Sequence, residues 1–139
     1  MAGKSSLDKG KRAEREIVKL LQPVVTKVYL AAGKEPISLE RNLMQSHKGG
    51  YDIEGLDWLA PEVKHHETLQ VNSWWQQTVR QAGVDRVPVL FYRQSRRPWL
   101  VRIRVSLKLA KSVITMPGDI SIAAFIIWFE RRLTEEVMK

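Results

Sequence analysis

Hydrophobic residues near the start of the chain recur at the spacing of an α-helix. Between Ala13 and Val24, apolar side chains return every three or four residues, which places them on one helix face. Pro23 lacks an amide hydrogen and should end or kink this helix, and a second helical piece is expected to run on to Gly33. Residues 1–8 lack this repeat, and we expect them to form a flexible basic arm.

Segments with strand-like composition follow between residues 38 and 66. We expect strands at "SLERNLMQ" (38–45), "YDIEGL" (51–56) and "WLAPEVKHH" (58–66), because turn residues bound each of them. Pro61 lies inside the third segment, so that strand should lie at a sheet edge, contain a bulge or begin near the proline.

The second half of the chain alternates again between the two patterns. "VNSWWQQTVRQAG" (71–83) predicts a helix with Asn72 or Ser73 as its cap and Trp75 on its apolar face. "VPVLFYR" (87–93) and "PWLVRIRV" (98–105) predict strands, whereas residues 106–116 are ambiguous. A last helix should begin near Asp119 or Ser121. The order helix, three strands, helix, two strands, helix predicts an α/β fold with a mixed central β-sheet flanked by helices.

The C-terminal segment 117–139 contains the apolar block "ISIAAFIIWF" (120–129). A solitary surface helix would not tolerate apolar residues on nearly all sides. The block is therefore either buried within the domain or part of a twofold interface. We treat 117–139 as a C-terminal helix and a possible dimer element of a homodimer.

Length and composition indicate one globular domain over residues 1–139. The chain is 44% hydrophobic and 27% charged, as soluble domains are. It has no cysteine, which excludes disulfides and thiolate metal sites. No signal peptide and no membrane span is recognisable, so we expect a cytoplasmic protein with no membrane partner.

The charge favours nucleic acid as a partner. The net charge is +8, from 23 Lys and Arg against 15 Asp and Glu. Residues 86–111 carry eight Lys and Arg and no acidic residue, and a second basic cluster precedes the first helix. Such cations suit a phosphate backbone, because each contact releases condensed counterions. The alternative is a solvated basic surface with no such role.

The segment "GGYDIEGLDWLAPEVKHH" (49–66) contains the candidate chemistry. Glu62 and Lys64 are two residues apart on one strand and so share a sheet face. If the preceding strand pairs with this one, Asp52 reaches the same place. Carboxylate and carbonyl oxygens, including that of Val63, are the ligands that Mg²⁺ or Mn²⁺ prefers. The alternative is that these residues are solvent-facing charges on ordinary strands.

Several motifs together resemble a known family. "KGKRAEREIVKLL" (9–21), the Asp52 strand, "EVK" (62–64) and the glutamine-bearing helix after it resemble the archaeal-type Holliday junction resolvases, most closely their phage-encoded branch. These resolvases belong to the PD-(D/E)XK nuclease superfamily, and the resemblance covers roughly residues 9–105. It implies a restriction-endonuclease-like core and a homodimer that makes paired nicks in four-way junctions during DNA recombination and repair.

The resemblance also implies roles for single residues. Glu14 would complete a metal site with Asp52, Glu62 and the Val63 carbonyl, and Lys64 would orient the attacking water. Together with the basic clusters, it gives the expected DNA contacts Lys9, Lys11, Arg12, Arg15, Arg41, Lys48, Gln76, Gln77, Arg93, Arg96 and Arg97. The helix after residue 117 has no clear archaeal counterpart.

Two other functions remain open. The first is a nuclease of the same fold that cuts other DNA structures, such as flaps, ends or ordinary duplex. The second is a DNA-binding module without catalysis. A carboxylate cluster would repel DNA unless a cation neutralised it, which favours an enzyme over such a module.

Overall fold

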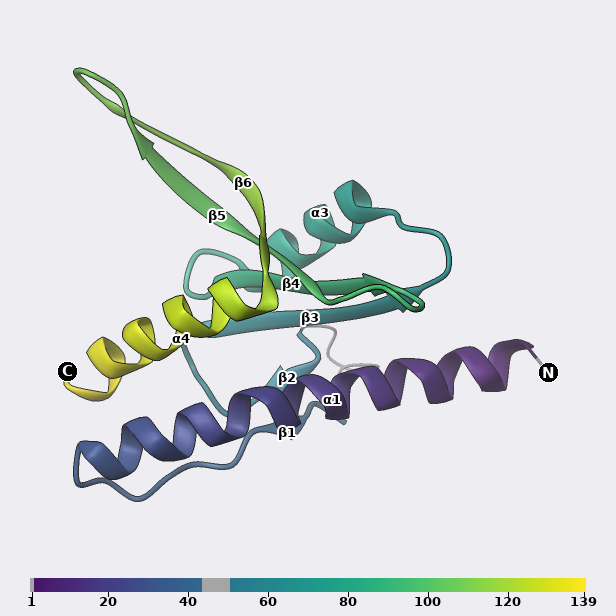
Figure 1. The fold of residues 1–139 in the computed structure, drawn as a ribbon, viewed down its shortest axis with the longest axis horizontal. Coiled ribbons are helices and arrows are strands. Elements are labelled where there is room, and N and C mark those ends of the chain that lie inside the picture. Colours follow the sequence, from purple (N-terminus) through teal and green to yellow (C-terminus); the bar gives the residue numbers. More distant parts are fainter. Residues whose placement is uncertain (1, 44–50) are drawn as a thin grey trace.

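A four-stranded sheet with helices on both faces forms the body of the protein (Figure 1). The computed structural model of the chain describes residues 2–43 and 51–139. The strand order is β3-β4-β5-β6, with β3 at Leu59–His66, β4 at Val87–Gln94, β5 at Leu100–Lys108 and β6 at Val113–Ser121. β3 and β4 are parallel, and the other neighbours are antiparallel. The predicted fold class, a mixed sheet flanked by helices, is confirmed.

The two faces of the sheet bury different side chains, because successive strand residues point to opposite sides. On one face, Val63 and Phe91 join the main core formed with the first and last helices. On the other face, Leu90 packs with Trp74 of α3 (Val71–Ala82). Glu62 is the register partner of Leu90, so its side chain lies on the α3 face of the sheet.

The first helix, α1 (Ala2–Ala31), is longer and less interrupted than expected. It runs through Pro23, because buried residues on both sides of the proline, Leu21 and Val25, continue one stripe against the core. That packing outweighs the loss of one backbone hydrogen bond. The helix therefore does not end at Pro23, the first of the two predicted effects of the proline, and residues 2–8, expected as a flexible arm, are helical.

Two very short strands stand where longer ones were expected. β1 (Glu40–Arg41) and β2 (Ile53–Glu54) form a separate antiparallel pair. The backbone of Asp52 forms hydrogen bonds to two neighbouring segments. Its amide donates to the Pro61 carbonyl at 2.8 Å, and its carbonyl accepts from the Asn42 amide at 2.8 Å. These two bonds link the β1–β2 pair to the edge of β3.

The helix α3 differs in detail from the prediction. Its N-cap is Gln70 with no side-chain capping bond, and its buried residues are Trp74, Thr78 and Ala82. The expected cap at Asn72 or Ser73 was therefore wrong. Trp75, expected on the apolar face, is partly buried and packs against the cluster of Trp74, Leu90 and Tyr92.

The C-terminal part adds a strand and a helix. The ambiguous residues 106–116 belong mostly to β5 and β6, which pair over nine positions and project from the sheet as a hairpin (Figure 1). α4 (Ile122–Val137) is capped by Ser121, whose Oγ accepts from the Ala124 amide at 3.0 Å. Its buried residues, Phe125 among them, pack into the core of the same chain. A further role in a dimer stays a prediction. In the described part of the chain, no helix combines the length and apolar character that a membrane crossing requires.

Candidate active site

A cleft of about 580 Å³ opens between the N-terminal half of α1, the end of β3 and the segment leading into α3. Its lining includes all four residues predicted to be catalytic: Glu14, Asp52, Glu62 and Lys64. Val63, Lys9 and Gln77 also line it. The structure thus brings together four predicted residues, from α1, from the position before β2 and from β3, that are up to 50 positions apart in the chain.

Backbone contacts hold the Asp52 carboxylate at the open edge of β3. The Val63 amide donates to Asp52 Oδ2 at 2.7 Å, and only 5% of Asp52 is exposed. In a strand, the amide and carbonyl of one residue leave the chain on the same side. The Val63 carbonyl therefore lies on the Asp52 side of β3, where the predicted metal site requires it.

Glu62 and Lys64 lie together on the α3 face of β3. Glu62 is 3% exposed, and Lys64 Nζ lies 3.4 Å from Glu62 Oε1. Among the described residues, no donor reaches the buried Glu62 Oε2. Burial raises the pKa of the Glu62 carboxyl, and the charge of Lys64 opposes that rise.

Asp52 and Glu62 influence each other electrostatically. Burial, and then the negative charge of Glu62, raise the pKa of Asp52 to about 8, while the hydrogen bond from Val63 lowers it. The charge of Glu14 contributes a further rise in the pKa of Asp52. Burial and the charges of Glu62 and Glu14 therefore make Asp52 hard to ionise, which is the condition that a nearby cation would relieve.

Glu14 projects from α1 toward an arginine. Arg41 Nε donates to Glu14 Oε1 at 2.8 Å, and both side chains are largely buried. Arg41 was expected to contact a DNA phosphate, but its observed partner is a carboxylate of the candidate site. Its position beside the cleft fits a residue that holds Glu14 in place.

The donors of the cleft are oxygen atoms of the kind that hold a hard divalent cation. Within residues 2–43 and 51–139, no three His, Asp or Glu side chains form a ready metal-binding group. The pair Asp52 and Glu62 nevertheless offers oxygen ligands of the type that Mg²⁺ and Mn²⁺ prefer. The buried Glu62 Oε2, which no donor of the described chain reaches, is one such oxygen. Glu14 is held by Arg41 and would join only as a third ligand.

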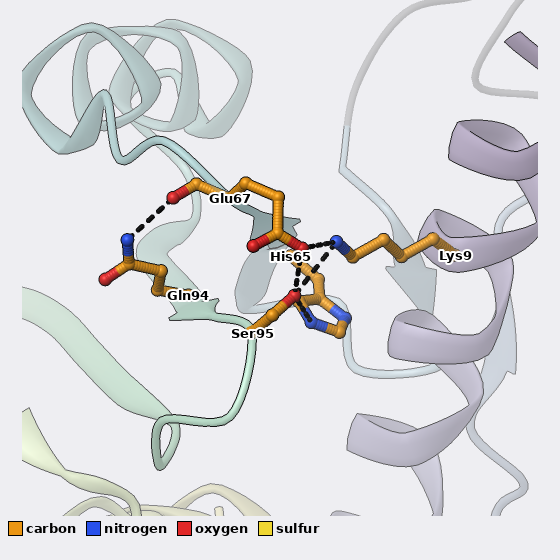
Figure 2. A network of polar contacts seen from close by, with 5 residues as sticks. All are labelled: Lys9, His65, Glu67, Gln94 and Ser95. Atoms are coloured by element: carbon orange, nitrogen blue, oxygen red, sulfur yellow. Dashed lines mark hydrogen bonds and ion pairs between the residues drawn. The ribbon is translucent and has the colours of Figure 1, made fainter. Parts of the chain in front are cut away.

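A polar network at the rim of the cleft was not foreseen from the sequence (Figure 2). Lys9 Nζ donates to Glu67 Oε1 at 2.8 Å and to Ser95 Oγ at 3.0 Å. Ser95 Oγ donates to the same Glu67 oxygen at 2.5 Å and lies 3.2 Å from His65 Nε2. The network connects α1 with the ends of β3 and β4, and no sequence motif indicates it.

The other expected DNA contacts lie on several elements. Lys11, Arg12 and Arg15 are exposed on α1, and Arg96 and Arg97 are exposed in the β4–β5 turn. Gln77 lines the cleft, whereas Gln76 is exposed on α3 and is not among the lining residues. Lys48 lies outside the described residues.

Arg93 has a different environment from the exposed arginines. Its guanidinium is 3.4 Å from Glu16 Oε1 and stacks over Trp99 at 5.3 Å from the ring centroid. These contacts anchor the end of β4 to α1. A contact from Arg93 to DNA stays a prediction.

Comparison with protein families gave one match. The family model described as "Phage putative PDDEXK endonuclease" matches residues 5–139, which is nearly the whole chain. Comparison with curated proteins and comparison with solved structures gave no match in either case.

Proposed function

This chain belongs to a family of phage PD-(D/E)XK endonucleases, and we propose from that premise that it is a metal-dependent, structure-selective DNA endonuclease that acts on four-way junctions. The observation that carries the proposal is the meeting of Glu14, Asp52, Glu62 and Lys64 in one cleft. A binding module would gain nothing from three buried carboxylates beside a phosphate backbone.

Asp52 and Glu62, with the Val63 carbonyl, would hold a Mg²⁺ or Mn²⁺ ion. When bound, this ion supplies positive charge next to the phosphate that is cut. The ion would also stabilise the ionised form of both carboxylates, whose pKa values burial raises.

Lys64 is the residue that positions the attacking water. Its ammonium group shares a sheet face with Glu62 and is within 3.4 Å of it, so the carboxylate holds the lysine at the cleft. The water oxygen bonds to phosphorus as the bond to the leaving sugar oxygen breaks, and the water gives up one proton while the sugar oxygen takes one up. Positive groups fixed beside the growing negative charge lower the barrier.

Arg41 acts as a positioning residue for Glu14. The 2.8 Å contact keeps the Glu14 carboxylate beside the metal-binding pair and balances part of its charge. On this reading Arg41 contributes to the arrangement of the site and does not touch the substrate.

Two observations favour a four-way junction as the substrate. The motifs in α1 and β3 resemble those of junction resolvases, and the net charge of +8 suits a ligand with several phosphate backbones. A homodimer would bring two clefts to symmetric strands of the junction.

The decisive experiment compares cleavage of a labelled four-way junction and a matched linear duplex in Mg²⁺. We expect paired nicks in the junction with the wild-type protein and none with EDTA. Asp52→Asn should lower the rate by about 100-fold or more, since it removes a metal ligand. Glu54→Gln is the matched control, because it also neutralises one carboxylate near the site, but an exposed one.

Each outcome separates the proposed function from its alternatives. Equal cutting of both substrates would keep the nuclease and remove the junction preference. Full activity of Asp52→Asn would refute the site. Binding without cleavage in Mg²⁺ and in Mn²⁺ would indicate a DNA-binding module.

A further inference from the structure

We propose that Lys9, Ser95 and His65 form a DNA phosphate subsite at the rim of the cleft, and that the carboxylate of Glu67 occupies this subsite until a phosphate displaces it. The inference deepens the proposed function and rests on it, because the phosphate is that of a DNA strand entering the cleft.

The geometry around one oxygen atom points to an anion site (Figure 2). Lys9 Nζ and Ser95 Oγ both donate to Glu67 Oε1, at 2.8 Å and 2.5 Å. A carboxylate oxygen resembles a phosphate oxygen in charge and in its capacity to accept hydrogen bonds. Glu67 Oε1 therefore marks the position that a phosphate oxygen would take.

The other contacts keep these donors together when the carboxylate leaves. Lys9 also donates to Ser95 Oγ at 3.0 Å. His65 Nε2 lies 3.2 Å from Ser95 Oγ, so the imidazole orients the hydroxyl. The three donors would therefore stay in place without Glu67. This is necessary if a phosphate is to displace the Glu67 carboxylate and bind at the same position.

Glu67 is free to swing out on a backbone that is held. Its side chain is 72% exposed, against 24% for Lys9, and an ion pair so accessible to water is weak. Its backbone carbonyl accepts from Gln94 Nε2 at 2.7 Å, which fixes the chain at this position. A phosphate can thus replace the side chain without moving β3 or α3.

The subsite belongs to the same cleft as the carboxylates. Lys9, His65 and Glu67 line the cleft together with Asp52 and Glu62. Ser95 completes the rim from the end of β4. A strand bound at the rim would continue toward the buried carboxylates, so the subsite would align the backbone on which cleavage occurs.

A structural role for the network is the competing explanation. In that case Glu67 would hold α1 against the sheet, and its loss would weaken the site. The two explanations give opposite signs for the effect of neutralising Glu67 on DNA affinity.

The test measures binding of a fluorescein-labelled four-way junction by anisotropy in EDTA, over a range of salt concentrations. Glu67→Gln should bind the junction about threefold to tenfold more tightly than wild type, because a neutral amide competes less well with phosphate. Glu135→Gln is the matched control: it makes the same change in net charge at an exposed position on α4 and should leave affinity nearly unchanged.

A second pair of variants tests the donors. Lys9→Gln should lower the slope of log K against log salt by about 1, as the loss of one phosphate contact does. Lys19→Gln, at an exposed lysine of the same helix, should leave the slope as in wild type. Ser95→Ala should weaken binding at every salt concentration.

The inference is overturned if Glu67→Gln binds no more tightly than Glu135→Gln, or if Lys9→Gln keeps the wild-type slope. These binding measurements need neither metal nor cleavage, so their outcome does not depend on whether the protein is catalytically active. A wild-type protein that fails to bind DNA at all would overturn the subsite and the proposed function together. Normal binding with unresponsive Glu67 and Lys9 variants would overturn the subsite alone.

Discussion

At the scale of single residues, the most informative feature is a pair of carboxylates that the fold buries side by side. Asp52 and Glu62 are 5% and 3% exposed, and burial raises the pKa of both carboxyls. A fold keeps such a costly pair only where a partner of opposite charge compensates it. Lys64 reaches Glu62, and the Val63 amide reaches Asp52. The charge of Lys64 also lowers the pKa of Asp52, but burial outweighs it and that pKa stays raised.

This pair makes the stability of the metal-free protein depend on pH. The folded-state pKa of Asp52 is about 8, against 3.8 for the free side chain, so the folded protein binds the proton more tightly than the unfolded chain. The stabilisation is fully present below pH 4 and is lost as the pH rises through 8. We expect the melting temperature in EDTA to fall between pH 5 and pH 9.

Asp52→Asn should flatten that fall, because the amide carries no titrating proton. Its melting temperature at pH 9 should exceed that of wild type by about 5 °C. A residual slope from Glu62, whose pKa is also raised, should remain. Thermal melts of the two proteins in EDTA at pH 5, 7 and 9 would decide this, and parallel curves would contradict it.

Prediction from local pattern alone succeeded where the residues are close in sequence, whereas Glu14 was expected only from the family resemblance. Glu62 and Lys64 share a strand face whatever the fold, so their proximity follows from strand geometry alone. The Ser95 contact with Glu67 spans 28 positions, and the Arg41 contact with Glu14 spans 27. Such pairs depend on how β4 and β1 are placed against their neighbours, which no local pattern encodes.

At the scale of elements, the helices and the central strands could be predicted, whereas breaks and edges could not. Pro23 removes one backbone donor from α1 but does not end the helix, since Leu21 and Val25 are buried on either side of it and pack against the core. β6 escaped prediction because "VITMPGDIS" contains a proline and a glycine. Gly118 is required there by close packing: a Cβ at this position would lie 2.4 Å from Val105 Cγ2.

The two glycines of the α1 region should respond in opposite ways to alanine. Gly10 lies within the helix and Gly33 just beyond it with φ of +71°, and a Cβ would meet nothing within 4 Å at either position. Gly10→Ala should raise the free energy of unfolding by about 0.5–1 kcal/mol through helix propensity. Gly33→Ala should lower it by about 1 kcal/mol, because alanine is strained at positive φ.

Urea denaturation of both variants gives these free energies directly. Since neither methyl group would have a neighbour, the difference between the variants isolates backbone conformation. Equal effects would mean that Gly33 does not need its left-handed conformation in solution.

At the scale of the whole molecule, the cations of the basic segment 86–111 form two groups, those that bond within the fold and those that are exposed. Arg86 donates to the carbonyls of Leu56 and Leu59, and Arg102 forms a two-bond contact with Asp119. These arginines, with Arg93, join parts of the fold. The cations left exposed on the described surface of this segment are Arg96, Arg97, Arg104, Lys108 and Lys111. Composition alone could not separate these two groups, because internal ion pairing depends on the fold.

The last helix, α4, packs one side into the core of the molecule. This packing can be tested separately from any role of the exposed side of α4 in a dimer. Phe129 of α4 is fully buried and lies 6.3 Å from Trp58 and 5.7 Å from Phe125, measured between ring centroids. Ile127 of the same helix is 63% exposed. Phe129→Ala should therefore lower the free energy of unfolding by about 3–5 kcal/mol, while Ile127→Ala should change it by less than about 0.5 kcal/mol.

Urea unfolding at two protein concentrations would separate folding from dimer formation, since the midpoint of an obligate dimer shifts with concentration. If Phe129 serves the core of one chain, the difference between wild type and Phe129→Ala should be the same at both concentrations. A large loss for Ile127→Ala that grows on dilution would instead place the exposed side of α4 in a dimer interface. The apolar block near the C-terminus would then serve both the core and the twofold contact, the two alternatives that its sequence leaves open.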